Sequence, residues 1–303
     1  MDFKIGDDFD ENGNSNEHKM SKKTAIIIVT VVAIVFGLLV FFISNAIFGK
    51  KDDDKPAVDT QVKLTDENVQ ILYKYVAYKN NGYDNDLFLR EDKVTNSTFT
   101  DQDKLYYALQ FVEPEELLYS GERNDKKQKI YIISISRIRD HLQRFFGEDI
   151  SFSPVDEITY KFSFTINDLG VATLTYSEEE QAYKVVFNKE KELTEEEQEK
   201  ALVKKVYTEL SSATKKPDGT LILNEKVIYT DLGKENNTFR IDIYKDYKHS
   251  TKIETKQNIT KEDLTANPFS ITDYLDKAAT ISYTFKVNQL NNSYYFDNST
   301  ITY

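Results

Sequence analysis

Three arginines, Arg137, Arg139 and Arg144, lie close together beside Asp140 and His141. Residues three or four positions apart share one face of a helix, so this segment can present a cationic face that binds an anion. A helix side that merely faces solvent has the same composition. The sequence therefore offers the three arginines as a candidate binding surface, with a solvated helix face as the alternative.

Tyrosines recur in the C-terminal segments, at Tyr283, Tyr294, Tyr295 and Tyr303. Tyr combines an apolar ring face with a hydroxyl group, and this combination suits a platform for carbohydrate or peptide. Amphipathic strands also use Tyr without any ligand. The candidate binding surface thus consists of Tyr283, Tyr294 and Tyr295 together with the three arginines.

The chain carries no recognisable catalytic motif. It has no Cys, which excludes disulfides, thiol catalysis and Cys-ligated zinc. Its three histidines, His18, His141 and His249, are too scattered to form a metal motif, and no phosphate-binding Gly loop or nucleophile elbow occurs. We therefore expect no cofactor, no metal and no enzymatic activity.

Two acidic patterns in the chain bear on that expectation. The segment 8–13 (DFDENG) begins like a calcium loop, but Lys19 stands where the bidentate Glu is required. Adjacent carboxylates such as Asp84 and Asp86, or Glu115 and Glu116, leave a carboxylate-dependent envelope hydrolase as an alternative. In a chain this rich in acids, their adjacency carries little information.

Three helices are expected after residue 62. Thr65 is the expected cap of the first, whose apolar face is formed by Val69, Leu72, Tyr73 and Val76. Thr100 and Asp103 resemble a capping box for the second helix. The third begins at Ser134 or Ser136, directs Ile138, Leu142, Phe145 and Phe146 inward and ends at Gly147.

The spacing of the apolar residues then changes from a helical period to alternation at every second residue. Strands are predicted over 158–166, 171–176 and 182–187, and their short connections make them an antiparallel meander. A second unit starts with a capping box at Thr194 and Glu197, and its helix is expected to carry Leu202, Val206, Tyr207 and Leu210. Strands over 220–229, 239–245 and 251–254, a short helix over 270–279 and a hairpin of 281–287 and 294–303 complete it.

These elements predict an α+β ectodomain in which helices pack on twisted antiparallel sheets. Helix followed by antiparallel strands occurs twice, at 63–192 and 193–303, and the two units form either one domain or two. The arrangement suggests cystatin-like or nuclear-transport-factor-2-like units. This is an analogy of fold, and it supplies no function.

Residues 24–48 form an apolar run without a single charged side chain. At about 1.5 Å per residue, a helix of this length measures roughly 37 Å and crosses a hydrocarbon core of about 30 Å with some tilt. The run is too long for a signal-peptide core and lacks a good cleavage site, so we expect a permanent transmembrane helix that acts as a signal anchor. Residues 1–23 are expected to be a disordered acidic cytoplasmic tail, with Met20 as a second candidate start, and 49–62 a charged linker.

Lysines are nearly balanced on the two sides of this run, at Lys19, Lys22 and Lys23 before it and Lys50, Lys51 and Lys55 after it. The expected orientation, with the N-terminus in the cytoplasm, therefore depends on the short tail rather than on charge. The net charge of −12 argues against a nucleic-acid partner. Abundant Lys, Asn, Ile, Tyr and Phe without Trp are typical of a low-GC bacterial coding sequence.

The sequence thus predicts a single-pass membrane protein with a non-catalytic extracytoplasmic domain for protein or envelope-polymer partners. A transmembrane signalling or envelope-assembly component is the main alternative, in which the tail would act as a bound peptide.

Overall fold

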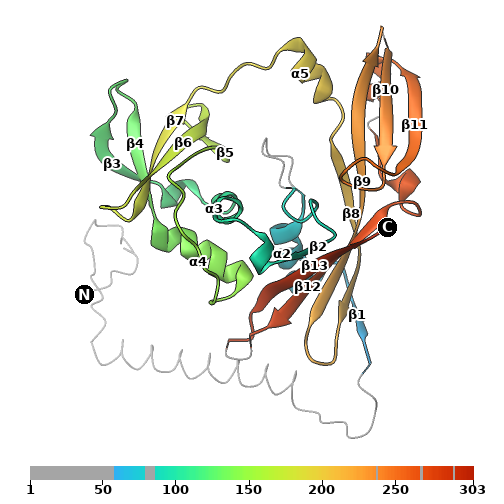
Figure 1. The fold of residues 1–303 in the computed structure, drawn as a ribbon, viewed down its shortest axis with the longest axis horizontal. Coiled ribbons are helices and arrows are strands. Elements are labelled where there is room, and N and C mark those ends of the chain that lie inside the picture. Colours follow the sequence, from blue (N-terminus) through green and yellow to red (C-terminus); the bar gives the residue numbers. More distant parts are fainter. Residues whose placement is uncertain (1–57, 79–85, 237, 267–268, 289–290) are drawn as a thin grey trace, which may run out of the picture. The chain divides into compact units, whose positions relative to one another are not determined.

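The computed structural model describes residues 58–78, 86–236, 238–266, 269–288 and 291–303. These residues belong to one unit, Val58–Tyr303, built of helices and antiparallel sheets (Figure 1). The predicted α+β class is confirmed. Among the described residues, no helix has both the length and the apolar character to cross a bilayer. The expected tail 1–23, membrane helix 24–48 and most of the linker 49–62 lie outside the described residues.

A five-stranded sheet is formed by the middle of the chain. Its order is β3 (Leu118–Arg123), β4 (Lys129–Ser134), β7 (Ala182–Asn188), β6 (Leu169–Ser177) and β5 (Glu157–Ile166), and every pair is antiparallel. The alternation of β5 buries Ile158, Tyr160 and Phe162 on one face. The antiparallel meander predicted for these last three strands is confirmed.

An eight-stranded antiparallel sheet collects the ends of the chain. Its order is β1 (Thr60–Val62), β8 (Val206–Lys215), β9 (Leu221–Glu235), β12 (Ala279–Val287), β13 (Tyr294–Thr302) and β2 (Lys93–Thr95). The long β9 pairs with β12 along its first half and with β10 (Thr238–Tyr244) along its second, and β10 pairs with β11 (Lys252–Ile259). The closing hairpin predicted from the sequence is confirmed, whereas β1 lies within the range expected to be linker.

The three helices of the first half form where they were predicted. α3 (Asp101–Leu109) begins with the Thr100–Asp103 capping box, and α4 (Ile135–Phe146) begins at Ser134, whose Oγ accepts from Arg137 N at 3.3 Å. α2 (Glu67–Val76) is capped by Asp66 rather than Thr65, because Asp66 Oδ1 accepts from the backbone N–H groups of Asn68 and Val69. The cap prediction for α2 was wrong by one residue.

Two helices of the second half were predicted wrongly. α5 (Glu195–Lys200) starts at the Thr194 capping box but ends before Leu202, and Val206–Lys215 is strand β8. The apolar spacing around Val206 suits a helix, but this segment pairs along nearly its whole length with β9, and tertiary pairing overrides a local pattern. The expected helix 270–279 contains only the 3₁₀ turn Thr272–Tyr274.

α6 (Lys261–Ala266) was not anticipated, although Thr260 and Asp263 cap it in the manner of the capping boxes recognised elsewhere. The other short elements are 3₁₀ turns at Asn96–Thr98 and Pro114–Glu116.

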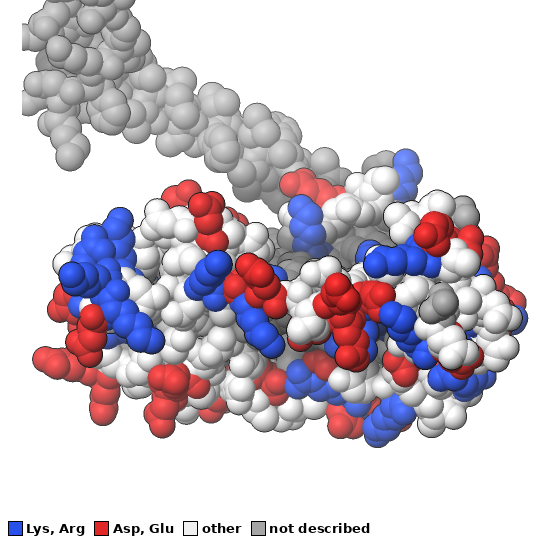
Figure 2. All heavy atoms as spheres, turned by 90° about the horizontal axis from the view of Figure 1, so that it is seen from above, with Lys and Arg blue, Asp and Glu red and all other residues white. Residues whose placement is uncertain are grey.

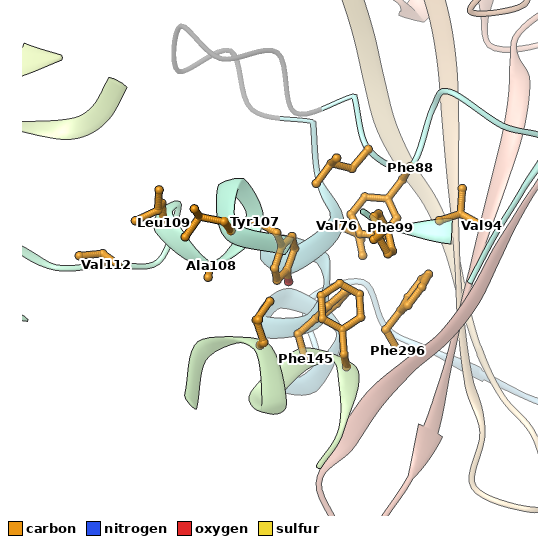
Figure 3. Close-up of a cluster of buried hydrophobic side chains, with 14 of the residues drawn as sticks. Val76, Phe88, Val94, Phe99, Tyr107, Ala108, Leu109, Val112, Phe145 and Phe296 are labelled. Atoms are coloured by element: carbon orange, nitrogen blue, oxygen red, sulfur yellow. The ribbon is translucent and has the colours of Figure 1, made fainter. Parts of the chain in front are cut away.

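The main core joins elements of both predicted units. α4 contacts β4 of the five-stranded sheet and β13 of the eight-stranded sheet, and α3 contacts α4 and β5. An aromatic cluster fills this junction, with Phe145 from α4 between Tyr107 of α3 and Phe296 of β13 (Figure 3). Together with the pairing of β2 with β13, this shared core makes 58–303 one unit, with a smaller second core beside β9, β10 and α6.

Candidate binding site

α4 brings two of its side chains, Arg137 and His141, against the turn Pro114–Glu116. Arg137 Nε lies 3.2 Å from Glu116 Oε1, and His141 Nε2 lies 3.0 Å from Glu116 Oε2. His141 is buried, and Arg137 also faces Asp140 at 3.7 Å. Because Glu116 and Asp140 already neutralise Arg137, this end of the proposed cationic face fixes the turn to the helix.

Arg144 and two of the predicted tyrosines meet at the other end of α4. Arg144, Tyr294 and Tyr295 line one hollow of about 400 Å³. Helix α4 packs beside β13 here (Figure 1). We call this hollow the α4–β13 site. Two tyrosine rings and one guanidinium, from segments about 150 residues apart in sequence, therefore share a concave surface.

Gly147 shapes this site. Its φ of 88° and ψ of 169° lie in a region that is open essentially only to glycine. The chain turns here directly from the end of α4, and the Tyr295 ring packs over the glycine, with Cδ2 3.5 Å from the position a Cβ would take. Gly147 therefore ends the helix, as predicted, and also allows the helix end to pack against Tyr295.

The remaining lining of the α4–β13 site is polar. It consists of side chains that sequence reasoning did not select: Asp140, Gln143, Glu148, Asn288, Asn291 and Ser293. The Asn-rich segment before β13 was recognised as a hairpin turn but not as part of a site. Amides and carboxylates next to two tyrosines can hydrogen-bond a polar ligand while the rings cover its apolar parts.

The other predicted site residues lie elsewhere. Arg139 is exposed on α4 and does not line this hollow. Tyr283 is fully buried, so its place in a surface platform was wrong. Strand β12 points it inward, where its hydroxyl donates to Glu225 Oε2 at 2.7 Å. Tyr303 is half exposed, and its hydroxyl donates to Asp92 Oδ1 at 2.8 Å.

Glu225 is the most deeply buried acid in the described part of the chain. Tyr73 of α2 donates to its Oε1 at 2.5 Å, opposite the bond from Tyr283. Burial raises the pKa of Glu225, although both hydroxyl groups oppose that rise by stabilising the carboxylate. With no exposed surface, this carboxyl ties α2 to the sheet and has no contact with solvent-borne ligands.

A larger hollow, of about 920 Å³, lies between α5 and β9. Two of the acids that line it are paired with lysines: Glu196 with Lys200 at 2.7 Å and Glu199 with Lys234 at 2.6 Å. The hydrogen bond from Lys200 lowers the pKa of Glu196. A general acid requires a raised pKa, so Glu196 is not suited to that role.

Two of the carboxylates noted in the sequence bind other side chains of the fold. Glu116 serves Arg137 and His141, and Asp86 binds Arg90 and Tyr247. Asp84 lies outside the described residues. Across the described ranges, no group of three or more His, Asp or Glu side chains is placed to hold a metal ion.

Charged side chains of both signs are interspersed on the face shown in Figure 2. Comparison of the chain with protein-family models, with curated proteins and with solved structures gives no match.

Proposed function

We propose that this chain is a single-pass membrane protein whose unit Val58–Tyr303 is a non-catalytic binding domain outside the cytoplasm of a bacterial cell. The observation that carries the proposal is the uncharged apolar run 24–48, placed shortly before a folded α+β unit. A helix of this length is stable in a bilayer because it satisfies all of its backbone hydrogen bonds internally. The charged segment after it is suited to act as a spacer.

The α4–β13 site is the proposed contact for a protein or an envelope polymer. Its support is the meeting of Arg144, Tyr294 and Tyr295, since Tyr and Arg are the side chains most often found at the energetic centres of binding surfaces. We also propose that the fold resembles cystatin-like or nuclear-transport-factor-2-like units. The packing of α4 against the five-stranded sheet at β4 supports this resemblance.

Anchoring is tested by alkaline extraction of cell membranes. The full chain should remain in the membrane pellet, whereas a variant that lacks residues 24–48 should be released into the soluble fraction. A variant that lacks residues 2–19 is the control and should stay in the pellet, because it keeps the apolar run. Release of the full chain by alkali would overturn the proposal.

The binding role is tested with the full chain immobilised in lipid nanodiscs and exposed to solubilised envelope material. Arg144→Ala and Tyr295→Ala should lose the captured partner. Arg139→Ala is a matched control, because Arg139 is an exposed arginine of the same helix that does not line the site. Equal capture by all three variants would remove the α4–β13 site from the proposal.

A further inference from the structure

The turn between β10 and β11 is held in one shape by a buried aspartate. Asp246 accepts from the backbone N–H of Ser250 at 3.0 Å and from that of Thr251 at 2.6 Å. Lys245 N donates to Thr251 O at 2.9 Å and closes the turn. These bonds fix the two aromatic residues inside it, Tyr247 and His249, before any ligand arrives.

Tyr247 separates two neighbouring hollows. One, of about 390 Å³, is also lined by Tyr229 and His249, and the other, of about 270 Å³, is also lined by Tyr303. The Tyr247 hydroxyl donates to Asp86, which in turn binds Arg90. The ring is thus anchored at both ends, by the turn and by the segment before β2. We call the two hollows the Tyr247 groove.

The rings of the groove are braced by their neighbours. His249 stacks on Tyr244 with centroids 4.4 Å apart and planes 4° from parallel, so its position is supported from β10. Tyr229 meets Tyr247 edge to face, at 5.9 Å and 82°. Rigid aromatic surfaces lose little conformational entropy when a ligand binds, which favours binding.

Tyr229 lies beneath the groove. Its side chain is 1% exposed and its hydroxyl is buried, so Tyr229 supports the Tyr247 ring from below and does not itself contact a ligand. The exposed rings that line the groove are those of His249 and Tyr303.

The charges and rings of the groove define the class of ligand. Four Asp and three Lys or Arg side chains line the two hollows, so the formal charge is close to neutral and favours neither a polyanion nor a polycation. Only Leu89 and Val206 contribute aliphatic surface, which is too little for a lipid chain or an apolar peptide. Aromatic faces bordered by carboxylates match a neutral molecule with C–H faces and many hydroxyl groups.

We infer that the Tyr247 groove binds a neutral carbohydrate chain, with consecutive sugar units on the two sides of Tyr247. Two hollows that share one tyrosine fit a linear chain better than a single sugar. The inference rests on the proposed function, because it places the groove on the side of the membrane where envelope polysaccharide is present. It names the polymer class and adds a site separate from the α4–β13 site.

The test is calorimetric titration of the full chain in detergent micelles with three neutral hexasaccharides: chitohexaose, cellohexaose and maltohexaose. At least one should bind. Tyr247→Ala should weaken that binding by at least about tenfold, the equivalent of about 1.4 kcal/mol. His249→Asn removes an exposed ring that lines the first hollow and keeps a residue that tolerates the φ of 56°, so it should weaken binding by about three- to tenfold.

Tyr119→Ala is the matched control, because Tyr119 is an exposed tyrosine on β3 of the other sheet. It should bind the hexasaccharide like the unmodified chain. A thermal melt of each variant separates loss of binding from loss of folding, and His249→Asn serves where Tyr247→Ala does not fold.

Four results would overturn the inference: no binding of any hexasaccharide, binding that survives both groove substitutions, binding that only Tyr295→Ala abolishes, or preference for poly(glycerol phosphate) over all three neutral chains. Because membrane extraction tests the anchor separately, failure of the titration with a membrane-bound chain would reject the groove assignment and leave the anchor proposal intact.

Discussion

Replacement of Phe145 by Ala tests the aromatic junction of the core. The Phe145 side chain is 1% exposed, so the change removes a fully buried ring. Its centroid lies 4.7 Å from that of Tyr107, 4.7 Å from that of Phe146 and 5.1 Å from that of Phe296. Because the walls of the cavity belong to two helices and a strand, they cannot close together without breaking other contacts.

The loss of folding stability should therefore reach the upper part of the range that is usual for Phe→Ala substitutions in a core. Phe→Ala in a core costs about 3–5 kcal/mol, and aromatic pairs add about 0.5–1.5 kcal/mol each. For Phe145→Ala we expect the free energy of unfolding to fall by about 4–5 kcal/mol. At about 2–4 °C per kcal/mol for a domain of this size, the Tm should fall by about 8–20 °C.

The assay is urea and thermal unfolding of the unit Val58–Tyr303, followed by circular dichroism. Tyr119→Ala is the control and should cost less than about 1 kcal/mol, because its side chain is 47% exposed. Both variants should unfold in one cooperative transition. A loss below about 2 kcal/mol for Phe145→Ala, or separate transitions for the two sheets, would refute the claim that this cluster joins them.

Three further predictions concern single buried or strained groups. Burial raises the pKa of Glu225, so its contribution to stability is full below the unfolded pKa of about 4.3 and is lost as pH rises toward the folded value. In urea titrations the stability of Glu225→Gln relative to the unmodified chain should therefore rise with pH from about 4 to 8, and parallel curves would contradict this. Burial raises the pKa of Asp246, but the hydrogen bonds from the N–H groups of Ser250 and Thr251 outweigh burial, so the pKa is lowered overall. The contribution of Asp246 to folding stability is therefore present above the unfolded pKa of about 3.9 and is lost as pH falls through the folded pKa. The cost of Asp246→Asn should accordingly be large at pH 7 and shrink in strong acid, whereas an unchanged cost would show that the carboxylate does not hold the turn. Gly147→Ala should lower the free energy of unfolding by about 1–3 kcal/mol, because the φ and ψ of Gly147 are strained for Ala. Gly170 has a negative φ and ordinary contacts, so Gly170→Ala is the control and should cost clearly less. Equal losses for the two variants would argue against backbone strain at Gly147.

Local signals in the sequence were sufficient for elements that local chemistry determines. The capping box at Thr100, the cap at Ser134 and the alternation from Ile158 each lie within one segment, and the structure confirms them. Val206 shows the limit of such signals. Its apolar spacing fits a helix, but pairing with β9, a partner reached only after a turn, decides that it lies in a strand.

The candidate site was anticipated only in part, for a similar reason. Helix periodicity identified Arg144, and strand composition identified Tyr294 and Tyr295, but their meeting depends on the packing of α4 against β13. Tyr283 has the same alternating context as an exposed strand tyrosine. The main core buries its ring, for example against Phe88, and its hydroxyl is paired with Glu225 of β9; both partners are distant in sequence, so no local pattern reveals them.

The central claim is that the folded unit lies outside the cytoplasm on a membrane anchor. The chain has no Cys, so a single introduced thiol reports its own location without a background signal. Glu179→Cys places a thiol in the exposed turn between β6 and β7, and Ser15→Cys places one before the apolar run. With a membrane-impermeant maleimide, Glu179→Cys should be labelled on intact cells and Ser15→Cys only after permeabilisation. Labelling of Ser15→Cys alone on intact cells, or of neither until the cells are opened, would contradict the account.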